Sequence, residues 1–393
     1  MMNVKTLGKS LFQAVIAATL VSCGGGSETF TTSDSTAGEL QGGGSALING
    51  GLTGRIVTAQ RALPFEFDLA SGKGRDVPVI TVQDALVSTG FDDDVRVGYF
   101  SGTEGAGFVH TGTQCHRIPG NISNGVLTRY ESCFAVFDEN LVRTRYVRTI
   151  GSEVEGAVKL SPSGRYVAFS EIYDNSRGEK VSTTVIMNIA SLEYVGVFDQ
   201  PEPLFGPSSS PAFAWGPNDE FVFSGVENGR VKLSVVAANT FQVVDERLFP
   251  TSLDSRINSF DLSPDGSQLL FDVDGSVFLL DMSTFLFTVP VVAQLGKLRS
   301  PRWSPDGDWF MVLNETSSPA PAFDINFQAT VFPSIRSLYA IPANSSEQVV
   351  VGGGQLNEAI LIEYEPDDSP GELSTFYPGD TALDIPYFDW LPR

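Results

Sequence analysis

Four stretches of this chain share one pattern of apolar and polar positions. Each has an apolar residue, a short polar turn and then an apolar run of strand-like composition. The clearest example is residues 262–272, which read L-S-P-D-G-S-Q-L-L-F-D, and the others begin near residues 160, 215 and 303. Proline presets φ for the first central position of a type I turn, and glycine accepts its left-handed exit. The pattern therefore predicts a β-hairpin at each place.

The spacing of these hairpins predicts the architecture. The turn prolines Pro162, Pro217, Pro264 and Pro305 are 55, 47 and 41 residues apart, which is the period of a four-stranded propeller blade. Third and fourth strands are expected after each hairpin, for example at residues 277–281 and 285–292, and at 337–341 and 348–351 after the last one. The turn residues are structural; they are Pro162, Gly164, Pro217, Pro264, Asp265, Gly266, Pro305, Asp306 and Gly307.

The repeat resembles a known family. Residues 263–271 and 304–310 look like the WD40-like, PD40-type repeat of TolB-type β-propellers. Two copies depart from it, since Ser163 replaces the aspartate and residues 216–223 change the outer turn positions. The resemblance implies a blade and an envelope protein partner, but TolB's separate N-terminal α/β domain has no counterpart here, so its own partner is not carried over.

The ends of the chain predict how the ring closes. Residues 385–392 resemble an innermost strand, while residues 55–59, 65–69 and 77–80 are strand candidates with a hairpin at 68–73. We therefore expect an all-β propeller closed by a composite blade from both terminal segments, which removes free sheet edges. Residues 82–150 are expected to form one irregular blade, and residues 359–364 a strand in an insertion or degenerate blade. Six blades are expected, with seven as the alternative.

The N-terminus predicts export and lipidation. Residues 1–22 have a basic start and an apolar run at 11–21 that is too short to span a bilayer, as in a signal peptide. The following L-V-S-C resembles the lipobox of bacterial lipoproteins, which implies that Cys23 carries the acyl chains, palmitate among them. The alternative is an ordinary signal peptide with an incidental cysteine. Because residue 24 is not aspartate, the resemblance implies an outer-membrane lipoprotein facing the periplasm, with the cell surface as the alternative. Residues 23–50, rich in Gly, Ser and Thr, are expected to be a tether and residues 51–393 the propeller.

The net charge bears on the kind of partner, and the cysteines bear on whether the protein holds a disulfide. A formal charge of −22 argues against nucleic acid as a partner. Cys115 and Cys133 are expected to pair in the oxidising envelope, where such a bond would contribute roughly 3 kcal/mol; two unrelated buried thiols are the alternative.

The search for catalytic motifs finds little. The sequence has no Gly-x-Ser-x-Gly elbow and no His-Glu-x-x-His or Cys-x-x-Cys spacing. His110 and His116 flank Cys115 and are expected to be structural, and Trp215 and Trp303 are expected to pack between blades and not to stack on a ligand. No metal or cofactor is expected, although residues 92–94 and 272–275 could offer carboxylates to Ca²⁺.

We expect a non-catalytic scaffold that binds an envelope protein or peptide. The alternative is a lyase or hydrolase that acts on polysaccharide in the propeller funnel. The enzyme would need a cluster of inward-facing His, Arg, Tyr and acidic residues there, whereas the scaffold would have an apolar or weakly charged funnel mouth and no such cluster. The sequence gives no indication of oligomeric state.

Overall fold

A computed structural model of the chain divides it into two compact units, residues 1–45 and 46–393. The expected signal peptide, Cys23 and residues up to 47 lie outside the described residues. The described residues are 48–60, 63–76, 96–118, 129–148, 153–174, 180–200, 213–227, 230–249, 257, 259–317, 322–324, 329–331, 334–352, 358–364, 374–375 and 388–393. Among them, no helix is both long and apolar enough to cross a membrane.

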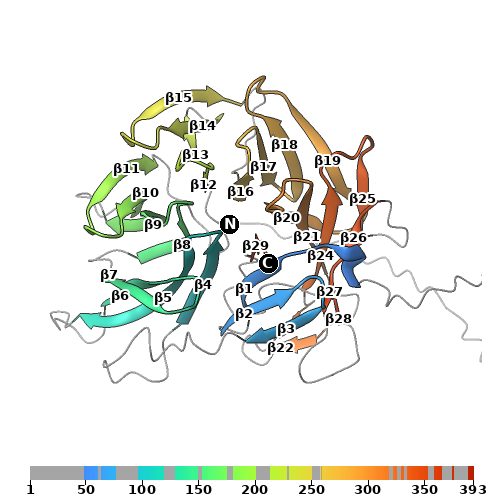
Figure 1. Cartoon of the computed structure of the whole chain (residues 1–393), viewed down its shortest axis with the longest axis horizontal. Helices are drawn as coiled ribbons and strands as arrows, with labels where there is room; N and C mark the ends of the chain where they lie inside the picture. The colour runs from blue at the N-terminus through green and yellow to red at the C-terminus, as the bar shows by residue number, and fades with distance from the viewer. Residues whose placement is uncertain are drawn as a thin grey trace, which may run out of the picture. The chain divides into compact units, whose positions relative to one another are not determined.

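In the second unit, six sheets surround a common centre, and each places one strand innermost (Figure 1). From the centre outward, blade 1 consists of β29 (Phe388–Leu391), β1 (Arg55–Gln60), β2 (Leu63–Asp68) and β3 (Lys73–Asp76). Blade 2 consists of β4 (Arg96–Thr103), β5 (Gly107–Ile118), β6 (Arg129–Phe137) and β7 (Arg143–Arg148). Blade 3 consists of β8 (Glu153–Leu160), β9 (Tyr166–Asp174), β10 (Lys180–Asn188) and β11 (Tyr194–Gln200).

The other three blades follow in chain order. Blade 4 consists of β12 (Phe213–Trp215), β13 (Phe221–Glu227), β14 (Arg230–Val236) and β15 (Val243–Leu248). Blade 5 consists of β16 (Ser259–Leu262), β17 (Gln268–Val273), β18 (Ser276–Asp281) and β19 (Phe287–Ala293), joined by β25 (Val349–Val351). Blade 6 consists of β20 (Lys297–Trp303), β21 (Trp309–Ser317), β24 (Ser334–Pro342) and β26 (Ile360–Leu361). Shorter elements are η1 (Ile48–Gly51) and the pairs β22 (Ala322–Asp324) with β23 (Ala329–Val331) and β27 (Glu363–Tyr364) with β28 (Ser374–Thr375).

The six-bladed, all-β propeller is confirmed, and so is its composite blade. The last strand, β29, pairs antiparallel with the first, β1, and Ile56 lies opposite Trp390. Asn49, just before β1, adds a second link. Its side-chain amide donates to the carbonyls of Leu69 and Glu363 and accepts from the Glu363 N–H. Strands from both ends of the chain thus complete one sheet.

Two expected strand positions were wrong. Residues 348–351 were expected to be the fourth strand of the last repeated blade, but β25 pairs in parallel with β19 on the outer edge of blade 5. The fourth strand of blade 6 is β26, within the stretch at 359–364 that was expected to be a strand of an insertion or degenerate blade. In blade 1 the outer strand is β3, which comes directly after the hairpin; residues 77–80 lie outside the described residues.

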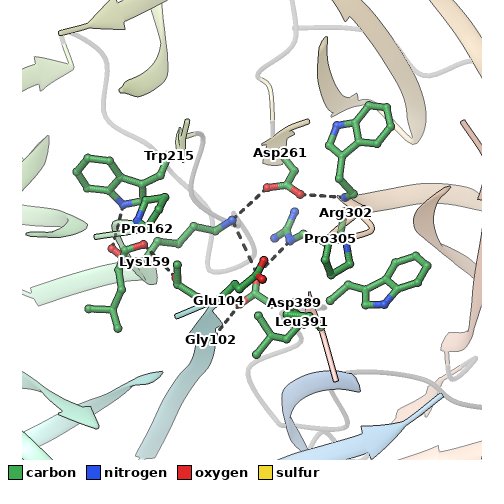
Figure 2. A pocket seen from close by; sticks show the side chains of 15 residues that line it. Gly102, Glu104, Lys159, Pro162, Trp215, Asp261, Arg302, Pro305, Asp389 and Leu391 are labelled. Atoms are coloured by element: carbon green, nitrogen blue, oxygen red, sulfur yellow. Dashed lines mark hydrogen bonds and ion pairs between the residues drawn. The ribbon is translucent and has the colours of Figure 1, made fainter. Parts of the chain in front are cut away.

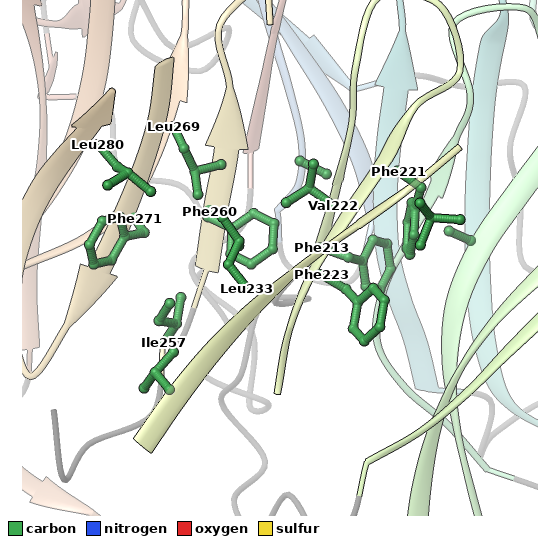
Figure 3. Close-up of a cluster of buried hydrophobic side chains, with 14 of the residues drawn as sticks. Phe213, Phe221, Val222, Phe223, Leu233, Ile257, Phe260, Leu269, Phe271 and Leu280 are labelled. Atoms are coloured by element: carbon green, nitrogen blue, oxygen red, sulfur yellow. The ribbon is translucent and has the colours of Figure 1, made fainter. Parts of the chain in front are cut away.

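The hydrophobic core lies between blades. Because side chains alternate across a strand, Leu269 and Phe271 of β17 pack toward blade 4, whereas Leu270 packs toward blade 6. Figure 3 shows the cluster where blades 4 and 5 meet, to which blade 4 contributes Phe213 and Val222 and blade 5 contributes Phe260 and Phe271. Comparable clusters lie at the other interfaces between neighbouring blades. This packing holds the inner strands in fixed positions around the centre.

Candidate functional site

Each blade places one residue at an equivalent point near the end of its innermost strand. In the repeats this residue stands two positions before the first residue of the turn. In the order of blades 1 to 6, the six residues are Asp389, Ser101, Lys159, Ala214, Asp261 and Arg302. We call this set the central ring. Its four charged side chains point toward one another from different blades (Figure 2).

Ion pairs connect these charged side chains across the centre. Lys159 Nζ lies 3.6 Å from Asp261 Oδ1 and 3.9 Å from Asp389 Oδ1. Arg302 Nε lies 3.6 Å from the same Asp389 oxygen. Two cations and two carboxylates thus form one network that joins blades 1, 3, 5 and 6 and has no net charge.

Asp389 is the most highly connected member of the central ring. Its second carboxylate oxygen accepts the Ser101 hydroxyl at 2.7 Å and the Gly102 N–H at 3.2 Å, both from blade 2. Blades 2, 3 and 6 therefore all contact one carboxylate on the last strand. Such convergence offsets the cost of burying a charge.

The other charges are anchored by the backbone. Asp261 accepts the N–H of Trp303 at 2.9 Å, and Arg302 donates to the carbonyls of Phe388 and Pro301 at 2.9 and 2.7 Å. Burial lowers the pKa of Lys159 and the charge of Arg302 lowers it further, while Asp261 and Asp389 act in the opposite direction. The central ring is thus a packed, largely dehydrated polar layer.

A hollow of about 160 Å³ opens above this layer; we call it the central hollow. All six blades line it, with Gly102, Thr103, Glu104, Lys159, Leu160, Pro162, Trp215, Asp261, Arg302, Trp303, Pro305, Asp389, Trp390, Leu391 and Pro392. Small-molecule sites usually enclose about 300–1,000 Å³. The central hollow is therefore smaller than a usual small-molecule site.

The tryptophans of the central hollow also hold neighbouring blades together. Trp215 Nε1 donates to the carbonyl of Lys159 in blade 3 at 3.2 Å, and its ring stacks on Tyr166 with centroids 6.5 Å apart. Trp303 is buried in the cluster between blades 5 and 6. Both residues thus pack between blades, and their edges also contribute to the mouth of the hollow.

The turn residues predicted from the repeat lie in the hairpin turns between the first two strands of blades 3 to 6, and two of them border the central hollow. Pro162 and Pro305 line the central hollow. Asp265 bonds within its own turn, to the hydroxyls of Ser263 and Ser267, and Asp306 likewise accepts from Ser304. Gly164, Gly266 and Gly307 have φ of 67°, 74° and 77°, the left-handed values that the turn requires.

The other candidate residues lie elsewhere. His110 is buried in blade 2 against Phe100, with ring centroids 6.2 Å apart. Cys115 and Cys133 lie on the adjacent strands β5 and β6, where Cys133 is opposite Gly112, but their side chains and that of His116 are not among those described. The disulfide stays a prediction.

The two candidate Ca²⁺ sites differ in what the structure describes. Residues 92–94 lie outside the described residues. Asp272 is buried and accepts the Ser259 hydroxyl at 2.5 Å, while Asp274 and Gly275 form the tight turn between β17 and β18. Within the described parts of the chain, no three His, Cys, Asp or Glu side chains gather as a metal site would require.

Sequence reasoning missed the central ring. The repeat is recognisable by its turn, and the position two residues before the turn varies in chemical type from blade to blade. A column of Lys159, Asp261 and Arg302 in otherwise apolar strand ends was nevertheless visible. Charged residues at such positions indicate that the strand ends meet at a shared polar centre.

The six sheets around a shared centre define a six-bladed β-propeller. No protein-family model matches the chain, and no curated protein sequence matches it. Among solved structures it is similar to a putative TolB from Agrobacterium tumefaciens, with 11% identity over 87% of this chain and 100% of that chain and a TM-score of 0.43.

Two other solved structures are also similar. The hydrazine synthase of Kuenenia stuttgartiensis has 15% identity over 68% of each chain and a TM-score of 0.40. The β-propeller domain of the trilobed protease from Pyrococcus furiosus has 12% identity over 71% of this chain and 85% of that chain, with a TM-score of 0.38. The propeller fold that the repeat predicts is confirmed by the six sheets of the structure.

Proposed function

We propose that this protein is a lipid-anchored β-propeller of the bacterial cell envelope that binds a protein or peptide segment at the mouth of its central hollow, without catalysis. One observation carries the proposal: the four charges of the central ring are engaged with one another and with the backbone. A group that acts as general acid or base must exchange its proton with substrate. Breaking this network to do so would leave buried charges without partners.

The charged layer was not expected for a scaffold, which was predicted to have an apolar or weakly charged funnel mouth and no cluster of Arg and acidic side chains. In the central hollow the four charges lie beside proline, tryptophan and leucine side chains and one exposed carboxylate, Glu104. Rigid loops with such a composition suit the docking of a polypeptide segment.

Site-specific crosslinking tests this proposal. A photoreactive amino acid at position 104 should crosslink a partner protein in intact membranes, because Glu104 is exposed at the mouth. The same probe at position 139 is the matched control, since Glu139 is an exposed carboxylate of the same blade outside the residues that line the hollow. Equal crosslinking from both positions, or turnover of envelope polysaccharide without a reproducible partner, would contradict the proposal.

A further inference from the structure

A second hollow, of about 470 Å³, lies on blade 1. Its lining consists of Arg55, Glu66, Asp68, Ser71, Lys73, Gly74, Arg75 and Arg393. None of these residues lines the central hollow. Its volume falls within the range of about 300–1,000 Å³ that small-molecule sites enclose. We call it the basic pocket.

The charge of the basic pocket is opposite to that of the whole chain. Four cationic side chains, Arg55, Lys73, Arg75 and Arg393, face two carboxylates, Glu66 and Asp68. The side chains therefore sum to +2, in a protein whose formal charge is −22. Such a local concentration of positive charge attracts anions against the field of the remaining surface.

The two carboxylates leave this positive charge only partly balanced. Glu66 is shared by two arginines: Arg75 Nε donates to it at 2.7 Å, and Arg55 approaches its other oxygen at 3.5 Å. Asp68 lies 3.6 Å from Arg393. Lys73 is exposed and forms no ion pair with any residue that the structure describes.

Neighbouring groups hold both the anions and the cations in place. The Ser71 N–H donates to Asp68 at 2.7 Å. Burial alone would raise the pKa of Asp68, but the hydrogen bonds from Ser71 and the charge of Arg393 lower it. The Arg55 guanidinium lies over the ring of Phe108, 5.2 Å from its centroid. Arg55 is thus positioned by blade 2 as well as by its own strand.

We propose that the basic pocket binds a phosphate group. Planar guanidinium groups offer paired donors that match the oxygens of phosphate, and lysine adds a point charge. A phosphate monoester carries about −1.5 to −2 charges near neutral pH, opposite in sign to the net charge of the lining side chains. The group can belong to free phosphate or to the phosphodiester of a phospholipid headgroup, which carries a single negative charge, since both present anionic oxygens to the arginines.

Lys73 provides the sharpest test, because its replacement breaks no ion pair among the described residues. In Lys73→Gln the Kd for inorganic phosphate should rise by about tenfold, as expected for loss of one charge-assisted contact. Lys297→Gln is the matched control: Lys297 is also exposed, also begins a strand and lies on blade 6. The Kd should not change in this control.

The experiment uses the full chain with Cys23→Ala, so that no acyl chain contributes, and measures phosphate by calorimetry. Flotation with phosphatidylglycerol–phosphatidylcholine vesicles, against phosphatidylcholine alone, distinguishes the two sources. Binding to either probe that weakens in Lys73→Gln and not in Lys297→Gln supports the site and identifies the source. No binding to either probe, or equal effects of the two substitutions, overturns it. Neither result bears on docking at the central hollow.

Discussion

Asp219 stands in the glycine position of its turn, and its carboxylate binds Ser163, which stands in the aspartate position of the preceding turn. The Ser163 N–H and hydroxyl donate to Asp219 at 3.0 and 2.5 Å, and Arg165 Nη2 lies 3.1 Å away. Burial alone would raise the pKa of Asp219, but these donors lower it. The two departures from the repeat therefore complement each other.

This pairing predicts that replacing either residue alone with the one typical of the repeat lowers the free energy of unfolding. Ser163→Asp would place a second carboxylate against Asp219 and should cost about 1–3 kcal/mol of unfolding free energy. Asp219→Gly relieves the positive φ of 62° but removes the bonds to Ser163, so a net loss of about 1 kcal/mol is expected. Urea unfolding measures both.

The double variant is the decisive control. With Ser163→Asp and Asp219→Gly together, the first turn regains the aspartate and the second the glycine that blade 5 has at Asp265 and Gly266. Stability should return to within about 1 kcal/mol of the natural protein, which is a strong favourable coupling. Additive losses would contradict the pairing.

Asp389 should be the most sensitive position of the central ring. Asp389→Asn keeps the shape of the side chain but leaves Lys159 and Arg302 with one carboxylate fewer. Removing one partner from a buried ion pair costs about 3–5 kcal/mol, so a similar fall in unfolding free energy is expected. Asp308→Asn, on an exposed turn residue, should change stability by less than about 0.5 kcal/mol. Comparable effects of the two would show that the network adds little.

His110 predicts a specific loss of stability in mild acid. Burial lowers its pKa from the usual 6.5 to about 4. In the unfolded chain His110 takes up a proton near pH 6.5, but in the folded protein only near pH 4. Unfolding is therefore favoured as the pH falls between these values, by roughly 3 kcal/mol in total.

The variant His110→Phe isolates this effect from that of other groups. Its unfolding free energy is measured from pH 7 to pH 4 in parallel with that of the natural protein. The decline over this range should be smaller in the variant by roughly 3 kcal/mol. Parallel curves would mean that the folded protein protonates His110 as easily as the unfolded chain does.

The lipid anchor has its own test. Cys23→Ala should move the protein from the membrane fraction to the soluble fraction, because no acyl chain could be attached. Cell fractionation and metabolic labelling with palmitate would measure this. Labelling at unchanged strength in the variant would contradict lipidation at Cys23.

Most of the fold could be predicted from the repeated turns. Proline and glycine constrain φ locally, so the hairpins and their spacing were readable without tertiary information. The sequence could not predict that β25 joins blade 5 while β26 completes blade 6. An apolar triplet such as Val349–Val351 fits the outer edge of either blade, and only tertiary packing selects blade 5.

The candidate sites were harder to predict for a related reason. Central-ring residues are far apart in sequence, and their meaning depends on the blades that bring them together. The basic pocket likewise joins Arg393 to residues near Arg55, at opposite ends of the chain. In the same way, Asp219 looked like a degenerate turn residue because its partner belongs to another repeat.

The composite blade also determines how the propeller would respond to mechanical force. A pull transmitted through the residues before Ile48 reaches β1, which lies between β29 and β2 and not at a sheet edge. Extracting β1 would require both of its neighbours to detach together, and the Asn49 bonds to Leu69 and Glu363 would have to break as well. The chain thus enters its folded body at an interior strand, which is held by neighbours on both sides.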